Sequence, residues 1–240
     1  MQRLILGAKA LGLPLTPAQL ESFRVYLENL VAWNRKLNLT AITDPEQIEV
    51  RHFLDSLSIL QAGEARQELS SPRARAIDIG SGAGFPGIPL AISFPHAHVT
   101  LLEATGKKVA FLEHVALQLG LAGVAAIHGR AEEAAHDPAH RGQYGLALAR
   151  AVAQLPVVVE YALPFCRDGG CLVAHRGSEG AAEAQSAQRA IALLGGELQR
   201  VVPVRVPGLP EGPTLVVIRK AGPTPMGYPR RAGMPSKRPL

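Results

Sequence analysis

Apolar side chains recur at helical spacing through the first 60 residues of the chain. Thr16, Pro17 and Gln19 match the N-cap, N1 and N3 positions of a capping box, which satisfies the free N–H groups at the start of a helix. The apolar residues that follow share one helical face: Leu20, Phe23, Leu27, Leu30 and Val31. Asp44 then repeats the start signal before a second face of this kind. We therefore predict an all-helical cap of two or three helices over residues 1–70.

Beyond residue 75 the pattern changes to short apolar runs separated by helical stretches. This alternation is typical of an α/β fold with a doubly wound parallel sheet. The runs lie at residues 76–79, 99–102, 124–127, 146–148, 171–174, 198–206 and 215–218. Because a turn rich in proline and glycine joins the last two, with no crossover helix, we expect these two to pair antiparallel. We therefore predict a seven-stranded, mostly parallel sheet with an antiparallel last strand over residues 71–221.

Composition places the chain among globular proteins. Hydrophobic residues make up 47% and charged residues 19% of its 240 residues, which is too apolar for a disordered chain. No eighteen apolar residues run together, and Lys9 interrupts the mildly apolar start, so neither a membrane span nor a signal peptide is expected. Only Cys166 and Cys171 are present, which suits a reducing compartment. We predict a cytoplasmic protein.

Positive charge is concentrated at the carboxyl end. The net charge is +5, but the last 22 residues contain no acid and six basic residues: Arg219, Lys220, Arg230, Arg231, Lys237 and Arg238. The rest of the chain is therefore close to neutral. A basic tail over residues 222–240 is typical of a protein that contacts a polyanion, although a solvated tail without a partner explains the charge equally well.

The most informative motif is AIDIGSGAGFPG, in which Asp78 ends a predicted strand and Gly80, Gly82 and Gly84 form the turn after it. In an open α/β sheet, ligands bind beyond the carboxyl ends of the strands, where glycine lets the backbone come close. Glu103 ends the second predicted strand, 21 residues after Gly82, and is suited to accept hydrogen bonds from ribose hydroxyls. A ribose-containing cofactor is therefore expected.

The identity of this cofactor depends on the charge around the loop. Gly82, Gly84 and Gly87 also fit the dinucleotide pattern, but a carboxylate at Asp78 would repel a pyrophosphate. S-adenosylmethionine (AdoMet) carries no phosphate and is cationic at sulfur, so it gains from a nearby acid. Pro86 also disfavours a long helix that would cradle phosphates. These features favour AdoMet over a nicotinamide cofactor, with a tight turn that binds nothing as the remaining alternative.

Several longer segments resemble those of one protein family. They are WNRKLNLTAITDPEQIEVRHFLDSL, DIGSGAGFPGIPLAI, LLEATGKKVAFLEHV, HGRAEE, LALARAVA and YPRRAGMPSKRPL, and they run in family order from about residue 20 to the end. The chain resembles the RsmG (GidB) family of 16S rRNA guanine-N7 methyltransferases. The resemblance implies a class I, Rossmann-like methyltransferase fold, AdoMet as donor, and a guanine of the small-subunit rRNA as acceptor. Free rRNA, a precursor and the assembled subunit all remain possible substrates.

The resemblance also implies site residues. Besides Asp78, Gly82 and Gly84, the AdoMet contacts would be Gly80, Phe85, Glu103, Ala104, Thr105, Ala131, Glu132 and Arg150. From local pattern alone, Glu132 is equally well a first-turn acid of a helix. The expected RNA contacts are Lys36, Asn38, Arg51, His52, Arg230, Arg231, Lys237 and Arg238, with Asp55 near the entrance. Tyr228 is a candidate for stacking on a base.

The expected chemistry needs no proton acceptor. Guanine N7 has a free lone pair at neutral pH, so the enzyme would act by aligning the reactants, with no general base. Arg150 would hold the AdoMet carboxylate, donate to guanine O6, or serve only as a structural ion-pair partner. Pro138 separates His136 from His140, so no metal site is expected. A nicotinamide-dependent oxidoreductase and a non-catalytic RNA-binding protein are the rival interpretations, and a monomer is expected.

Overall fold

A helical cap is present at the N-terminus, with more helical elements than the two or three helices that the sequence predicted. A computed structural model describes all 240 residues. Its cap consists of α1 (Gln2–Ala10), α2 (Pro17–Leu37), α3 (Pro45–Ile48), the π-helix η1 (Glu49–Leu54), α4 (Asp55–Leu57), the 3₁₀-helix η2 (Ser58–Gln61) and α5 (Gly63–Leu69). The capping box before α2 is formed, because Thr16 Oγ1 accepts from the Gln19 N–H while Gln19 accepts from the Thr16 N–H. Asp44 caps α3 through the Gln47 N–H, at 2.9 Å.

The seven predicted strands form one sheet. Its strands are β1 (Arg75–Ile79), β2 (His98–Glu103), β3 (Val124–His128), β4 (Tyr144–Arg150), β5 (Cys166–Arg176), β6 (Gly196–Pro203) and β7 (Thr214–Lys220). They lie in the order β3-β2-β1-β4-β5-β7-β6. The first five pair in parallel, and β7 pairs antiparallel with both β5 and β6, as the sequence predicted.

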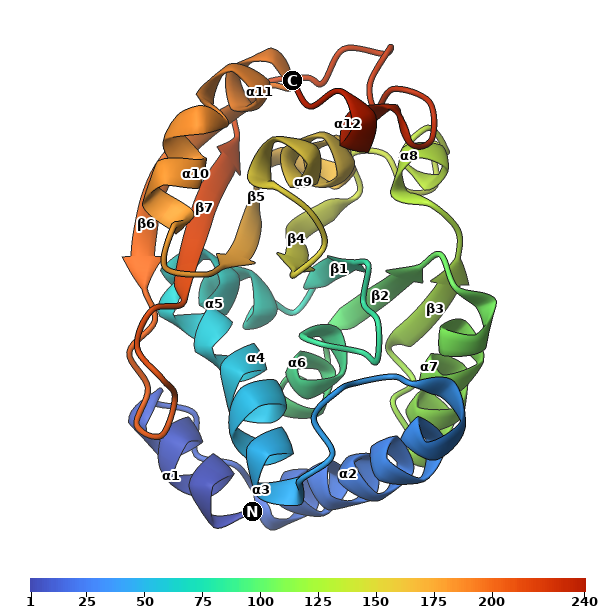
Figure 1. The fold of residues 1–240 in the computed structure, drawn as a ribbon, viewed down its shortest axis with the longest axis vertical. Coiled ribbons are helices and arrows are strands. Elements are labelled where there is room, and N and C mark those ends of the chain that lie inside the picture. Colours follow the sequence, from blue (N-terminus) through green and yellow to red (C-terminus); the bar gives the residue numbers. More distant parts are fainter.

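Helices cover both faces of the sheet (Figure 1). The further helices are α6 (Gly87–Ser93), α7 (Gly106–Gln118), α8 (Ala131–Ala134), α9 (Leu155–Ala162), η3 (Leu163–Phe165), α10 (Gly180–Ser186), α11 (Gln188–Leu193) and α12 (Met234–Lys237). Alternate strand residues enter two separate hydrophobic clusters. In β4, Leu146 and Leu148 face the cluster with α6 and α7, whereas Ala147 and Ala149 face the cluster with α9 and α11.

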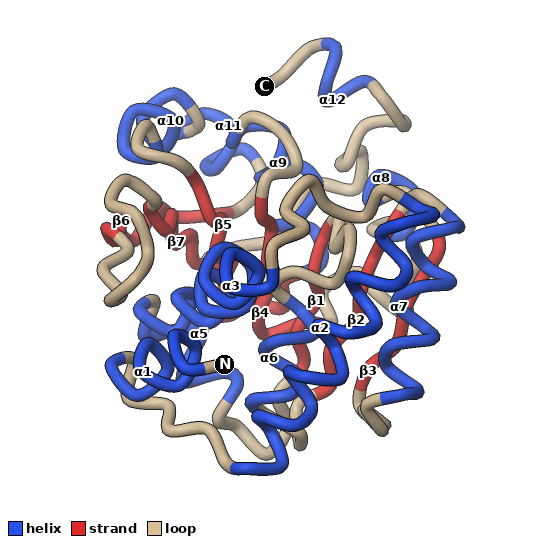
Figure 2. The backbone as a smooth tube through the Cα atoms, turned by 60° about the horizontal axis from the view of Figure 1, so that its bottom comes forward, coloured by secondary structure: helices blue, strands red, loops and turns tan.

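The N-terminal helices share one of these two clusters with the sheet. α2 lies across α6 and α7 (Figure 2). Tyr26 of α2 packs its ring 5.3 Å from Phe53 and 5.4 Å from Phe85, and its hydroxyl donates to the Ala83 carbonyl at 2.5 Å. This contact fixes the helical cap directly against the glycine loop that follows β1.

The carboxyl-terminal segment is folded against the rest of the chain. α12 contacts α9, and Pro229 and Pro235 are buried. The tail therefore has a defined path over the helices of the second face. None of the helices is both long and apolar enough to cross a membrane.

Candidate active site

The glycine loop after β1 is tied to the end of β2. Gly80, Gly82 and Gly84 have φ values of +68°, +59° and +98°, a left-handed region that favours glycine. The Glu103 carboxylate accepts from the Gly82 N–H at 2.9 Å and from the Thr105 N–H at 2.8 Å. The loop therefore takes a fixed shape at the carboxyl edge of the sheet, where the sequence placed it.

Asp78 lies beneath this loop and is fully buried. Its Oδ2 accepts from the Gly87 N–H at 2.9 Å, while its Oδ1 has no hydrogen-bond partner. Burial raises the pKa of Asp78 to about 7, against the lowering effects of the Gly87 N–H and the charge of Arg150. The negative charge expected beside the loop is therefore only partly present at neutral pH in the free protein.

A pocket of about 140 Å³ lies between the glycine loop and the ends of β2 and β3. Four residues expected from the sequence line it: Gly80, Ala104, Ala131 and Glu132. Its other lining residues are Ile79, Leu102, Gly129, Arg130, Val152 and Tyr161. We call it the cofactor pocket.

The residues around the loop suit a cationic, ribose-containing molecule. Asp78 Oδ1 and Ser81 Oγ are buried without partners. A Cβ added at Gly80 would lie 3.1 Å from Val152, so glycine lets the loop approach this pocket-lining side chain closely. The Glu103 oxygens each accept one backbone N–H and keep a second lone pair for a hydroxyl.

Seven of the residues expected at the cofactor do not line this pocket: Asp78, Gly82, Gly84, Phe85, Glu103, Thr105 and Arg150. A Cβ at Gly84 would meet Ile88 at 2.5 Å and the Tyr26 hydroxyl at 2.9 Å, so this glycine serves close packing. Phe85 lies instead between His52, whose ring stacks on it at 4.5 Å, and Arg150, whose guanidinium lies 5.2 Å from its centroid. The Gly82 backbone contacts Glu103, as described above.

A second, larger pocket of about 640 Å³ adjoins the first. We call it the acceptor pocket, and its lining residues are Arg51, His52, Asp55, Arg150, Ala151, Val152, Ala153, His175, Arg176, Gly177, Leu209, Pro210 and Pro213. Val152 lines both pockets, so they meet at this side chain. Ala151 beside it has a φ of +55°, an uncommon value for a residue other than glycine.

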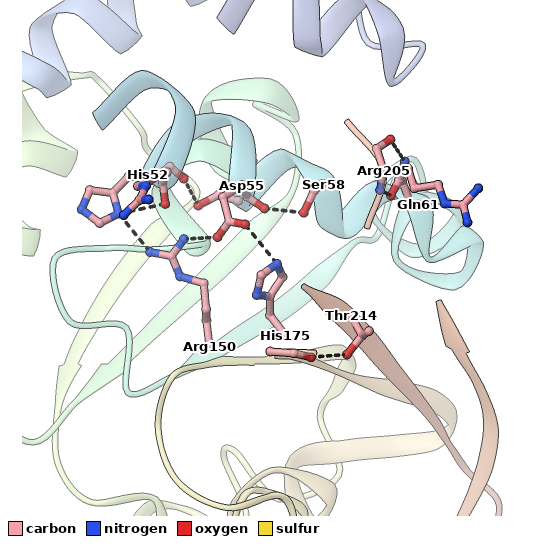
Figure 3. Close-up of polar contacts among 11 residues, drawn as sticks. His52, Asp55, Ser58, Gln61, Arg150, His175, Arg205 and Thr214 are labelled. Carbon is pink, nitrogen blue, oxygen red and sulfur yellow. Dashed lines mark hydrogen bonds and ion pairs between the residues drawn. The ribbon is translucent and has the colours of Figure 1, made fainter. Parts of the chain in front are cut away.

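Arg150 is held by Asp55 at the edge of the acceptor pocket (Figure 3). Arg150 Nη1 donates to Asp55 Oδ2 at 2.7 Å, and His175 Nε2 lies 3.2 Å from Asp55 Oδ1. Burial opposes the charge on Asp55, but His175 and Arg150 together lower its pKa below the ordinary value. The structural ion pair considered for Arg150 is thus present, and the same side chain also faces the pocket.

His52 is uncharged at neutral pH. Burial and the nearby Arg150 charge lower its pKa to about 4. Its Nε2 lies 2.7 Å from Thr40 Oγ1, and its Nδ1 lies 3.4 Å from Arg150 Nη2. The ring is therefore a fixed, neutral wall of the acceptor pocket.

Sequence reasoning missed His175 and Arg176 at the end of β5. Arg176 donates to the Ala153 carbonyl at 2.7 Å and pairs with Glu183, while its Nε is buried without a partner. The rule that ligands bind at the carboxyl ends of parallel strands pointed to this position. It was overlooked because no glycine turn or acid marks it. The loop between β6 and β7, with Leu209 and Pro210, was missed as well.

The residues expected to bind RNA lie in different settings. Arg51 and His52 line the acceptor pocket, and Lys36 and Asn38 are exposed at the end of α2. In the tail, Arg231, Lys237 and Arg238 are exposed. Arg230 differs from them, because its guanidinium donates to the fully buried carboxylate of Glu160 at 2.6 Å. The expectation that Arg230 faces a phosphate is therefore corrected.

The two cysteines and two of the histidines considered in the sequence take part in packing and hydrogen bonding within the fold. Burial raises the pKa of the Cys166 thiol to about 12 and that of Cys171 further. His136 Nε2 bonds the Pro229 carbonyl, and His140 Nδ1 bonds the Tyr144 hydroxyl. The structure contains no group of three or more His, Cys, Asp or Glu side chains arranged to hold a metal ion.

Two solved structures share this fold, and one of them is a methyltransferase. TrmN from Thermus thermophilus matches with a TM-score of 0.51 at 19% identity, covering 72% of this chain and 53% of that one. Geranyl diphosphate methyltransferase in complex with SAM matches with a TM-score of 0.51 at 17% identity, covering 70% and 87%. Together with the strand order, these matches define the class I, Rossmann-like methyltransferase fold.

Sequence similarity then narrows the class to one family. The family model for rRNA small subunit methyltransferase G (GidB) matches residues 19–207. The ribosomal RNA small subunit methyltransferase G of Roseiflexus castenholzii is 49% identical over 241 residues, and that of Dehalococcoides mccartyi is 43% identical over 240 residues. Both alignments cover the whole of each chain. The chain belongs to the rRNA small subunit methyltransferase G family.

Proposed function

We propose that this chain transfers a methyl group from AdoMet to N7 of a guanine in 16S rRNA. Membership of the family supports an AdoMet-dependent methyltransferase that acts on small-subunit rRNA. The observation that carries the proposal is the meeting of two pockets at Val152, on the carboxyl edge of the sheet. Such an arrangement lets a donor in the smaller pocket face an acceptor in the larger one.

The cofactor pocket and the glycine loop beside it together offer suitable groups for each part of AdoMet. Glu103 would accept from the ribose hydroxyls, and Ala131 and Glu132 would flank the adenine. Gly80 and the buried oxygens of Asp78 and Ser81 would lie near the amino acid portion. When bound, AdoMet supplies a methyl group on a positively charged sulfur. The role of the protein is to hold AdoMet in place and to exclude water from the site.

The acceptor pocket suits a guanine base. Guanine presents the O6 and N7 acceptors on one edge, whereas adenine presents an amino donor in place of O6. The guanidinium groups of Arg51, Arg150 and Arg176 that line this pocket are donors only. They would therefore favour O6 over the adenine amine. The N7 lone pair needs no general base, which agrees with a neutral His52 and an ion-paired Asp55 in the same pocket.

The RNA backbone would be held by exposed polar and basic side chains outside the pocket. We assign this role to Lys36 and Asn38, with Arg231, Lys237 and Arg238 of the tail. An A-form helix has a deep and narrow major groove, so guanine N7 must be presented in an unpaired or opened region. We further propose that the protein acts as a monomer in the cytoplasm, on the small subunit or its precursor.

One assay tests donor, acceptor and position together. Purified protein is incubated with radiolabelled AdoMet and small ribosomal subunits that lack the modification, followed by borohydride and aniline cleavage at N7-methylguanine. We expect a labelled 16S rRNA with one specific cleavage site. Label without cleavage would exclude N7 as the acceptor atom. AdoMet binding without transfer would indicate a binding role, and saturable NAD(H) binding without AdoMet binding would favour an oxidoreductase.

A further inference from the structure

The basic C-terminal tail is folded against the helices that line the cofactor pocket (Figure 1). α12 contacts α9, and Tyr228 and Leu240 pack against the hydrophobic cluster of that face of the sheet. The family model ends at residue 207, before the tail, although the terminal segment YPRRAGMPSKRPL resembles that of the family.

An ion pair with a buried carboxylate anchors the tail. Glu160 of α9 has no exposed side-chain surface, and Arg230 supplies its bonds. The Arg230 backbone N–H and Nε donate to Glu160 Oε1 at 2.8 and 2.9 Å, and Nη2 donates to Oε2 at 2.6 Å. Removal of one partner from such a pair leaves a buried charge uncompensated. The tail is thus held at this point by a strong and specific contact.

Further hydrogen bonds fix the path of the tail before and after Arg230. Arg141 donates to the carbonyls of Thr224 and Tyr228 at 3.0 and 2.8 Å. His136 Nε2 lies 2.8 Å from the Pro229 carbonyl oxygen. These bonds use backbone carbonyls of the tail, so they depend on its conformation rather than on its side chains.

The tail then contacts two residues that line the cofactor pocket. The Gly233 N–H donates to Glu132 Oε1 at 2.8 Å, and the Ser236 hydroxyl lies 2.9 Å from the Tyr161 hydroxyl. Glu132 and Tyr161 both line this pocket. The position of each side chain is therefore set partly by a residue more than seventy positions away in the sequence.

We propose that residues 228–238 form a clasp that positions Glu132 and Tyr161 and thereby sets the affinity for AdoMet. This inference rests on the proposed function of the cofactor pocket. Arg230 and Gly233 are positioning residues that lie outside the pocket lining. Gly233 contacts the pocket-lining Glu132 directly, whereas Arg230 acts by holding the tail on Glu160. Thermodynamic linkage makes the effect reciprocal, so bound AdoMet must in turn stabilise the docked clasp.

Two neighbouring arginines provide a matched pair of variants. Arg230→Met removes the ion pair with Glu160, whereas Arg231→Met removes an equal charge from an exposed side chain that makes no ion pair. AdoMet binding is measured by calorimetry without RNA, well below the melting temperature of each variant. We expect Arg230→Met to weaken AdoMet binding about tenfold, within the usual range of coupling between sites. Arg231→Met should bind AdoMet like the wild type.

A kinetic readout separates positioning from general destabilisation. The KM for AdoMet should rise in Arg230→Met, while kcat at saturating AdoMet stays near the wild-type value. A role in stability alone would lower the melting temperature without changing AdoMet affinity in the folded protein. Equal AdoMet affinity of folded Arg230→Met and the wild type would overturn the clasp and leave the proposed function intact.

If Arg230→Met fails to fold, hydrogen exchange in the wild type tests whether AdoMet binding is coupled to the clasp. The amides of residues 228–238 should exchange at least several-fold more slowly when S-adenosylhomocysteine, the product form of the cofactor, is bound. Unchanged exchange at saturating ligand would refute the clasp. If the wild type binds neither AdoMet nor S-adenosylhomocysteine, the proposed function of the pocket fails, and this inference fails with it.

Discussion

Asp78 shows how burial changes the charge of a single carboxyl group beside the glycine loop. Its pKa of about 7 in the free protein means that the carboxyl is largely protonated at pH 6. A cationic ligand nearby favours the carboxylate and so lowers this pKa, and binding then releases a proton. AdoMet affinity should therefore increase as pH rises from 6 towards 7, and level off at higher pH.

Calorimetry of AdoMet binding across this pH range checks the expectation. In Asp78→Asn the increase in AdoMet affinity between pH 6 and 7 should disappear, because the amide does not titrate.

The same pKa makes a second prediction, which concerns the stability of the protein without ligand. Between about pH 4 and 7 the folded state keeps a proton that the unfolded state has lost, so stability should fall with rising pH. An unaltered pH profile in Asp78→Asn would assign both effects to another group.

Asp55 is the residue that joins the helical cap to Arg150 and His175. Asp55→Ala should lower kcat by about 10-fold to 100-fold, because a small displacement of aligned reactants has effects of this size. It should also reduce the free energy of unfolding by about 3 kcal/mol, since the partner charge stays in a largely buried site. Turnover and urea denaturation measure the two effects. Asp168→Asn, at an exposed position near the start of β5, is the control, and wild-type turnover in Asp55→Ala would exclude the positioning role.

At the residue scale, the sequence predicted which side chains lie near the site better than it predicted what surrounds each of them. The glycine loop and Glu103 followed from motif and spacing, whereas the lining residues Ala104, Ala131 and Glu132 were implied by the family resemblance. The complete burial of Asp78 did not follow from the sequence, because the pattern of a strand does not show which elements cover it. Arg230 was assigned to RNA from local charge density, whereas its actual partner is 70 positions away.

At the element scale, the loop between β6 and β7 forms one wall of the acceptor pocket. Gln61 of η2 fixes the loop, donating to the Arg205 carbonyl at 2.7 Å and accepting from the Arg205 N–H at 2.9 Å (Figure 3). Val204 and Val206 beside this contact are buried in the hydrophobic cluster of the cap. Leu209, Pro210 and Pro213 are thereby held over the pocket. The loop should contribute to RNA binding and have little effect on AdoMet.

Gln61→Ala tests this division of roles. The variant loses both bonds to Arg205, so the KM for the ribosomal subunit should rise about threefold to tenfold, corresponding to about 1 kcal/mol for the lost anchor. The dissociation constant for AdoMet should not change. Glu211→Gln, in the same loop but without a bond to the cap, is the control. A changed AdoMet affinity in Gln61→Ala would show that the loop also shapes the cofactor pocket.

The elements themselves were predicted well, and their internal irregularities were not. The capping signals at Thr16 and Asp44 and all seven strands are confirmed. The second cap segment, however, passes from α-helix through the π-helix η1 to the 3₁₀-helix η2. His52 lies in η1 and Asp55 directly follows it, and both contact Arg150. Apolar spacing alone does not distinguish this irregular segment from a regular helix.

At the scale of the whole molecule, the strand order explains where the site forms. β1 pairs with β2 on one side and β4 on the other, so the chain reverses its direction across the sheet at this point. Helices before and after the reversal lie on opposite faces, which leaves a crevice at the carboxyl edge. The sequence predicted strand number and the antiparallel last strand. The contact of the helical cap and the tail with this crevice depends on long-range packing that no local pattern encodes.

The division of the tail between anchoring and RNA binding makes a prediction about salt. Arg230 is bound to Glu160, which leaves Arg231, Lys237 and Arg238 as the exposed basic side chains of the tail. If these contact phosphates, a triple change to glutamine should weaken RNA binding most at low salt. The slope of the logarithm of the binding constant against the logarithm of salt concentration should become shallower by about 0.7 per lost phosphate contact on single-stranded RNA. AdoMet affinity should stay unchanged, because the clasp anchors at Arg230 and Gly233 remain.

A second triple variant separates local contacts from net charge. Lys9, Arg73 and Arg189 are exposed and make no ion pair, so changing them to glutamine removes the same charge elsewhere. Filter binding to small-subunit rRNA at several salt concentrations measures both slopes. If the two triple variants behave alike, the tail contributes only through the overall charge of the protein. A shallower slope in the tail variant alone, at constant AdoMet affinity, means that one short segment serves the cofactor through its anchored arginine and the RNA through its exposed ones.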